Sequence, residues 1–476
     1  MTTRTHLHIA RLSLECATPL SIGTGGSDEA FDVELVRDAN GLPAIPGSSL
    51  TGVIRHLLAR VHGDAHSRSL FGFQDGGEGQ VSAVEVSWGC IQDSMGRTVD
   101  GLLLGAARNR LDDDPLLRFA RGTADTPVTR ERVRINHRGS AANRGKFDRA
   151  ILPAGYRFSA EIAMWSDGTD LPREDWSELL ALLSHPEMRL GGATRSGLGA
   201  ISIESIHERT FDLRKEREAF SNLARSVGDT STLQLRTSTS ASKGLPATFT
   251  LDLEPRHFWR IGRGDQPLSR GEKEADDLPR LERRVVWTNG VGVLSEPTEW
   301  LLVPWSAVKG AIAHRVAFHH NRLSGRFADD MEPDAIATYD KAETNEAIRD
   351  LFGFARNDRR IGGQSGQAGR LAANDVFVRI DPVHVKLLSH NAVDRFTGGV
   401  RKHMLFSEEV IWGLGFKMKI MLFPSREPEH SDPLADKALR MALRDLGSGT
   451  LSIGAGAGDG HGFFQGSVVS EVPNEQ

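Results

Sequence analysis

A chain of 476 residues is too long for one ordinary hydrophobic core, and two domains of about 200 residues fit this length. Its 39% hydrophobic and 25% charged residues are typical of a soluble globular protein, and no apolar run approaches the ~20 residues that a membrane span requires. With Cys16 and Cys90 as the only cysteines, we expect neither a disulfide framework nor a cysteine-rich metal site. The net charge of −5 argues against a general nucleic-acid coat protein. The N-terminus shows no signal peptide, which favours the cytoplasm.

The first part of the chain alternates strand and helix signals. Residues 7–22 alternate apolar and polar side chains, as a half-buried strand does, and residues 45–58 have apolar residues at helical spacing. Residues 81–91 and 132–135 resemble strands. A second helix is predicted at residues 176–183, followed by a strand at 200–206. The resulting order, β-α-β-β-α-β with a long insertion, predicts a ferredoxin-like fold.

The first helix has a distinctive start, IPGSSLTGVIRHLL. A Ser close behind the Pro can satisfy free backbone N–H groups in the first turn. The positive end of such a helix, with the hydroxyl groups of Ser48 and Ser49, is also a natural seat for a phosphate.

Four landmarks of the first part recur in the same order about 260–280 positions later. The helix start returns at residues 303–316, and a Leu-Phe-Gly motif follows both copies. Next come a strand–Gly turn–strand pattern and a closing Gly-rich stretch, the latter at residues 190–199 and 453–462. We therefore predict two homologous halves. Their limits are residues 1–210 and 248–476, with 211–247 as a linker. The second half is predicted to have strands at 248–253, 375–380, 417–422 and 463–469, and helices at 305–321 and 434–446.

Two basic segments, residues 130–149 and 390–403, lie at matching places in the halves. A run of charges is usually a solvated face. However, both segments sit between strands and contain Gly, which favours projecting hairpins whose cations hold phosphates without reading bases. The cations concerned are Arg132, Arg134, Arg138, Arg144 and Lys146 in the first segment, and Arg395, Arg401 and Lys402 in the second.

The glycine-rich and acidic segments leave alternatives open. Residues 453–462 contain a GxGxxG pattern, but a dinucleotide site needs a helix after it, and a strand is predicted here. These stretches are either tight turns or backbone packed closely against a ligand or helix. Five acids within residues 28–38 form either a solvated loop or a carboxylate near a scissile phosphate. The histidines have no zinc-site spacing.

Taken together, these motifs resemble the RAMP superfamily of CRISPR systems. The resemblance rests on residues 45–50 with Gly52 and Arg55, on the Leu-Phe-Gly motif and on the closing Gly-rich stretches. Residues 391–399, followed by Glu408 and Glu409, are similar to the thumb hairpin of the Cas-seven-like backbone subunits of type III effector complexes. Two copies in one chain resemble the fused tandem subunits of III-D-like systems.

The resemblance implies an α+β protein of two tandem ferredoxin-like (RRM-like, RAMP) domains with β-hairpin thumb insertions and Gly-rich loops. Such a protein serves antiviral defence: it lies along CRISPR guide RNA (crRNA), beside other Cas subunits of the complex, and displays the guide to complementary target RNA. An Asp in the loop before the first helix is needed for target cleavage. Asp32 matches that position best, with Asp28 as the fallback, and Asp32 would position Mg²⁺ or another divalent cation.

The second half departs from the family pattern. Trp305 replaces the first Gly, and Ala313 stands where the first half has Arg55. The preceding loop is rebuilt, so that Asp276 and Asp277 are no more than candidate counterparts of Asp32, and cleavage by the second half is in doubt. The residues expected to hold guide phosphates are Ser48, Ser49, Arg55, Lys309, His314 and Arg315. The alternatives are a non-catalytic scaffold of the same fold and a guide-processing endonuclease, which would require a catalytic His.

Overall fold

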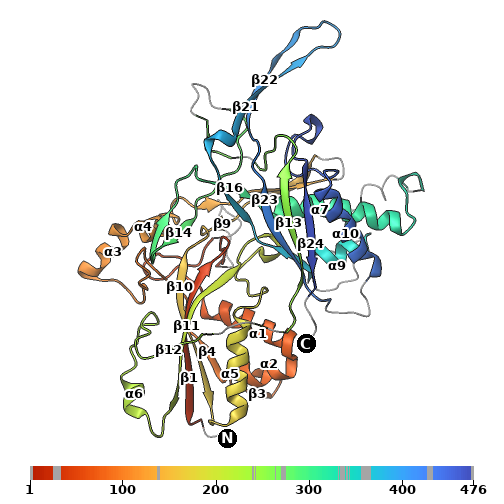
Figure 1. The fold of residues 1–476 in the computed structure, drawn as a ribbon. Helices are drawn as coiled ribbons and strands as arrows, with labels where there is room; N and C mark the ends of the chain where they lie inside the picture. Colours follow the sequence, from red (N-terminus) through yellow and green to blue (C-terminus); the bar gives the residue numbers. More distant parts are fainter. Residues whose placement is uncertain are drawn as a thin grey trace.

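The computed structural model describes residues 4–24, 34–136, 140–237, 241, 243–262, 264–269, 275–330, 332, 338, 341, 344–354, 366–425 and 432–472. Within these ranges the chain forms two main antiparallel sheets, each with its own hydrophobic core (Figure 1). Asp28, Asp32 and Arg138 lie outside the described residues.

The first sheet is built around β1 (His6–Cys16), which pairs with β10 (Arg157–Ser166) on one side and β11 (Ile201–Asp212) on the other. β4 (Val84–Val86) pairs with the outer side of β10. Helices α1 (Gly47–His62) and α5 (Asp170–Leu182) pack against this sheet, because their apolar faces and the core-facing side chains of the strands form one buried cluster.

The second sheet repeats this arrangement. Its strands are β19 (Leu371–Ala373), β23 (Phe416–Leu422), β13 (Ala247–Pro255) and β24 (Phe464–Glu471), in that order. Helices α7 (Trp305–Leu323) and α10 (Pro433–Gly447) share its core. In both sheets the last strand of the half lies beside the first, and the first beside the third. This is the predicted ferredoxin-like order, and the α+β class is confirmed.

The predicted strand at 375–380 is present as β20 (Val376–Arg379), but it lies outside the main sheet, where it pairs with β16 (Trp300–Val303). The short strand β19 takes the edge position of the sheet instead, beside β23.

The remaining elements form connections and insertions. Their bounds are α2 (Asp64–Phe71), β2 (Phe73–Asp75), β3 (Glu78–Gln80), β5 (Cys90–Ile91), α3 (Arg110–Asp113), α4 (Pro115–Gly122), β6 (Val128–Thr129), β7 (Arg132–Ile135), β8 (Ala141–Phe147), β9 (Ala150–Ile151), α6 (Arg217–Ser221), β12 (Gln234–Leu235), β14 (Val285–Thr288), β15 (Val291–Leu294), α9 (Glu346–Phe352), β17 (Gly353–Phe354), β18 (Gln367–Ala368), β21 (Val385–Val393) and β22 (Val400–Ile411).

The segment predicted as a linker packs onto the first half. β12 extends the first sheet by pairing with β11, and α6 places Phe220 edge-on against Phe211, with 5.7 Å between the ring centroids. Leu7 and Ile9 of β1 lie in the same small apolar cluster. The segment therefore covers the sheet face opposite α1 and α5.

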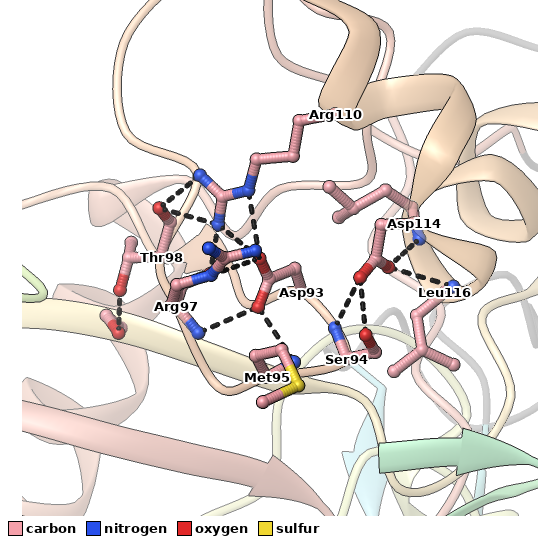
Figure 2. Close-up of polar contacts among 10 residues, drawn as sticks. Asp93, Ser94, Met95, Arg97, Thr98, Arg110, Asp114 and Leu116 are labelled. Carbon is pink, nitrogen blue, oxygen red and sulfur yellow. Dashed lines mark hydrogen bonds and ion pairs between the residues drawn. The ribbon is translucent and has the colours of Figure 1, made fainter. Parts of the chain in front are cut away.

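Two buried carboxylates hold the insertion that contains α3 and α4 (Figure 2). Asp93 accepts hydrogen bonds from the backbone N–H groups of Met95 and Arg97 and from the side chains of Arg97 and Arg110, each at 2.9 Å. Asp114 accepts from the first N–H groups of α4 at 3.0 Å, and also from the N–H of Ser94 at 3.0 Å. These acids therefore fix the turn to the helix and have a structural role.

We expect Asp93→Asn to lower the free energy of unfolding by about 2 kcal/mol at pH 7, because charge-assisted hydrogen bonds of a buried carboxylate are lost. Burial of Asp93 opposes ionisation, but the hydrogen bonds from Arg97 and the charge of Arg110 outweigh it and lower the pKa. The contribution is therefore present above the unfolded-state pKa of about 3.9 and is lost as the pH falls below it. Urea unfolding at pH 7 and pH 3 tests this: the difference from wild type should shrink at pH 3. The exposed Asp113→Asn is the control, and an equal effect of both variants would contradict the prediction.

Candidate nucleic-acid interface

The Gly-rich loop of the first half, residues 190–199, contacts the start of α7 in the second half. The side-chain Nε1–H of Trp305 and the amine of Lys309 donate to the carbonyl oxygen of Arg195, at 3.2 and 3.1 Å. Gly197, at φ +104°, lies so close to Asp375 that a Cβ there would overlap its carboxylate. The close approach of this loop to a helix, one of the alternatives open from sequence, is what the structure shows.

A buried ion-pair network fixes this joint between the halves. The guanidinium of Arg130, which is 4% exposed, donates to Asp375 Oδ2 at 2.8 Å and to Glu282 Oε1 at 2.7 Å. Burial alone would lower the pKa of Arg130, but the charges of Glu282 and Asp375 raise it. Asp375 also accepts the N–H of Trp305 at 2.8 Å. The network therefore joins the residues just before β7 to the first turn of α7.

Three further cations at the joint have no carboxylate partner among the described residues; we call Arg132, Arg189 and Lys309 the joint cations. Arg132 donates to the Ser196 carbonyl at 3.4 Å, and Arg189, which is 5% exposed, donates to Asn374 Oδ1 at 2.5 Å. The Nε of Arg189 has no hydrogen-bond partner in the described chain. Positive charge in the joint is thus incompletely balanced.

The pKa values of the joint cations show that burial disfavours their charged forms. Burial, followed by the charges of Arg195 and Arg132, lowers the pKa of Lys309 to about 8. Burial, aided by Arg195, lowers the pKa of Arg189 to about 10, and burial is also the main cause that lowers the pKa of Arg132 to about 10. The charge of Asp375 acts in the opposite direction on Arg132 and Arg189 but does not outweigh burial. An anion placed between these groups would be attracted, because buried cations with too little counter-charge are unfavourable.

The start of α1, the equivalent helix in the first half, is not covered in this way by another part of the described chain. Gly47 is buried so closely against the Val86 carbonyl that a Cβ would not fit. Ser48 and Arg55 are exposed and, at i and i+7, lie on one face of the helix. Among the described residues, neither they nor the hydroxyl of Ser49 forms a side-chain hydrogen bond or ion pair.

The expected role of serine in capping was wrong for both helices. The N-cap of α1 is Pro46 and that of α7 is Pro304, and neither helix has a side-chain hydrogen bond from its N-cap. In α7 the carboxylate of Asp375 accepts a hydrogen bond from the backbone N–H of Trp305. That N–H is therefore not free for a phosphate.

Both basic segments contain a two-stranded hairpin. β7 pairs with β8, where Arg134 and Lys146 are exposed and Lys146 lies 3.0 Å from Glu131. β21 and β22 form a longer hairpin that projects away from both sheets (Figure 1). Phe396, in its turn, is 99% exposed. Arg395, Arg401 and Lys402 of this hairpin are exposed, and the side chain of Arg144 in β8 is not described.

Of the other predicted cations of α7, Arg315 is paired within the second half. Arg315 forms an ion pair with Asp445 of α10, and Asp445 also contacts His319 at 2.7 Å. His314 is half-buried on the same helix. The charge of Arg315 is therefore compensated within its own half, unlike that of Lys309.

A comparison with protein families matches the RAMP superfamily to residues 13–202 and 296–465. The chain belongs to the RAMP superfamily. Each matched region lies within one half and contains its two main helices, α1 and α5 in the first and α7 and α10 in the second, so the chain is a tandem RAMP protein. RAMP proteins associate with CRISPR guide RNA and with other Cas subunits. No curated protein matches the sequence. Among the described residues, no helix is both long and apolar enough to cross a membrane.

The two acids predicted for cleavage in the second RAMP half are engaged at the root of its hairpin. Asp276 accepts the N–H of Ser407 at 2.8 Å and its hydroxyl at 3.2 Å. Asp277 accepts from Arg260 at 3.3 Å. In the described part of the chain, no group of three or more His, Cys, Asp or Glu side chains is arranged to hold a metal ion. In the described part of this loop, the carboxylates of Asp276 and Asp277 are therefore engaged by Ser407 and Arg260 and do not face a metal ion together.

The sequence analysis missed several residues of the joint in this RAMP chain. Arg195 lies within the stretch LGGATRSGLG and Arg189 directly precedes it, and basic residues in and beside a Gly-rich stretch were an available signal. Glu282 and Asp375 gave no such signal. They are 152 and 245 positions from Arg130, and only the packing of the halves brings them to it.

Proposed function

We propose that this protein is a backbone subunit of a type III CRISPR effector complex, which lies along the guide RNA and displays it for pairing with target RNA. The observation that carries the proposal is the set of joint cations, which come from both halves and have no carboxylate partner among the described residues. A backbone phosphate supplies the missing anion, and Arg and Lys at such places position RNA irrespective of sequence.

The head-to-tail contact of the halves supports assembly with other subunits. The hairpin root and Gly-rich loop of the first half contact the start of α7 in the second half. The start of α1 corresponds to the start of α7, and residues 453–462 correspond to the Gly-rich loop of the first half. These two surfaces have no counterpart within the described chain and lie at its two ends. Ser48 and Arg55 are exposed on the former, and Gly458 and Gly460 meet open space on the latter. A contact between two different surfaces repeats along a filament. Neighbouring RAMP-fold subunits would continue the same RNA-binding surface at both ends.

A salt titration of guide-RNA binding tests the role of the joint cations. The slope of log affinity against log salt is about −0.7 per phosphate contact for single-stranded RNA. We therefore expect Lys309→Gln and Arg132→Gln each to reduce the slope by about 0.7. Lys437→Gln, which removes an exposed cation on α10, should leave it unchanged. Because the pKa of Lys309 is about 8 in the free protein, raising the pH from 7 to 9 should weaken wild-type binding more than that of Lys309→Gln. Equal slopes for all four proteins would contradict phosphate contacts at the joint.

The proposal includes Mg²⁺-dependent cleavage of target RNA by the first half. Its support is the resemblance of the loop before α1, in which Asp32 matches the acid that such subunits need and Asp28 is the fallback. For the second half, a specific observation favours the scaffold alternative instead. The carboxylates of Asp276 and Asp277 are occupied by Ser407 and Arg260, and are not available together for a metal ion.

A further inference from the structure

The outer edge of the second sheet is open in the described chain. β24 pairs with β13 along one side, and no described residue pairs with its other side. Between Gln465 and Glu471 its residues are exposed, except for Val468, which packs against the core of the second half. Val469 therefore points to the opposite face of the sheet, and it is 51% exposed. Such an edge presents a row of backbone N–H and C=O groups that another strand can bind.

A hollow of about 500 Å³ lies on the same face, beside the end of β24. Its lining includes the apolar residues Leu245, Pro246 and Met421 and the charged residues Lys419 and Glu471. Lys419 is exposed and forms no hydrogen bond or ion pair with another described residue. A hollow of this size and lining takes an apolar group, and the amine beside it can donate to a carboxylate or a carbonyl oxygen.

The first half has a covering segment at the matching face. Counted from the Gly turn before β10 and before β23, Ala163 corresponds to Met421, and their cross-strand partners Ile9 and Thr248 correspond in the same way. In the first half, Ile9 and Ala163 form one apolar cluster with Phe220 of α6. The hollow of the second half thus lies where α6 lies in the first half.

The matching edge of the first sheet is covered as well. His207 of β11 pairs with the residue two positions after Ile9, and Val469 pairs with the residue two positions after Thr248, so that His207 and Val469 correspond. On its other side, His207 is paired with β12. Residues 213–237 therefore supply both a strand for the edge and an apolar side chain for the face. In the second half, no described segment fills either place.

We infer that the edge of β24 and the hollow beside it bind an extended segment of another subunit, which adds a strand to the second sheet. This inference rests on the proposed function, because it places the chain among other subunits. By analogy with residues 213–237, the segment runs antiparallel to β24 and puts a large apolar side chain into the hollow. Arg11 shows how a cation on this face holds such a segment, since it donates to the carbonyl oxygen of Ala224 at 2.7 Å. Lys419 can act likewise. Backbone hydrogen bonds supply the affinity of strand addition, and the hollow selects the sequence.

Hydrogen exchange of individual amides tests this inference, with the free chain compared with the chain in the complex assembled with guide RNA. In the free chain, the N–H groups of β24 that face β13 should exchange slowly and the alternate ones rapidly. In the complex, the alternate ones should slow by about tenfold or more, because each then donates to the added strand. A partner that touches only the side chains would leave the alternation in place.

Val469→Lys separates strand addition from a general effect of assembly, since a charged side chain at an edge opposes strand pairing. We expect this variant to retain guide RNA and to lose the slowing in β24. Val293→Lys is the matched control, because Val293 is 59% exposed on another strand, β15, and this variant should behave as wild type.

The contrary results are distinct. Failure of the complex to retain guide RNA overturns the proposed function, and this inference with it. If RNA is retained but the alternate amides of β24 exchange equally fast in the free chain and in the complex, only this inference is overturned. Slowing that is the same in Val469→Lys, or that is already present in the free chain, also overturns it. In the latter case, sedimentation at rising concentration tells whether a second copy or the chain itself fills the edge.

Discussion

Arg130→Met should lower the free energy of unfolding by about 3–5 kcal/mol, the range measured when one partner of a buried ion pair is removed. Glu282 and Asp375 would then remain buried without their counter-charge, since their side chains are 4% and 0% exposed. Because Arg130 belongs to the first half and both acids to the second, the lost free energy is that of the contact between the halves. Urea unfolding of the full chain measures the change, and we expect the two halves to unfold in separate transitions in the variant.

Two further variants control this result. Arg134→Met removes an exposed cation two residues along the same segment and should change stability by no more than about 0.5 kcal/mol. Adding Glu282→Gln and Asp375→Asn to Arg130→Met removes the uncompensated charges and should recover part of the loss. If the triple variant is less stable than Arg130→Met, or if Arg134→Met is equally destabilising, the network does not stabilise the joint in the way its geometry indicates.

Asp32→Ala should reduce Mg²⁺-dependent cleavage of target RNA by about 100-fold or more, because a metal-held or proton-transferring carboxylate contributes several kcal/mol to the transition state. Binding of guide and target should be unchanged. The measurement is the product ladder of an end-labelled target in the assembled complex, with wild type and variant side by side. One defined product is expected to disappear, and EDTA should suppress the same product in wild type.

Asp28→Ala in the same acidic loop tests the fallback residue, and it should cleave as wild type does if Asp32 is the required acid. An identical ladder for wild type and Asp32→Ala would make the first half a scaffold at that position. A loss in Asp28→Ala alone would transfer the role to Asp28.

Much of the fold was accessible from sequence because the periodicity of each half and its repetition point to the same answer. The Trp305-containing helix and the strands around Phe249 and Ile420 were placed correctly, since their apolar spacing is regular. β19 was missed because three residues, Leu371–Ala373, are too few to show a period. The joint was missed for another reason: Arg130 and Asp375 are far apart in sequence, and nothing local to either residue reports their contact.

The position of the connecting segment has a consequence for assembly. Residues 213–237 do not stretch between the halves but fold back on the first sheet through α6 and β12. The covalent connection therefore restricts the relative movement of the halves little, and it keeps the two contacting surfaces at high local concentration. Separate subunits would have to find one another in the right sequence at every assembly. Here, which domain stands next to which is decided when the chain is translated, and each half is free to diverge as long as its own side of this single joint still fits.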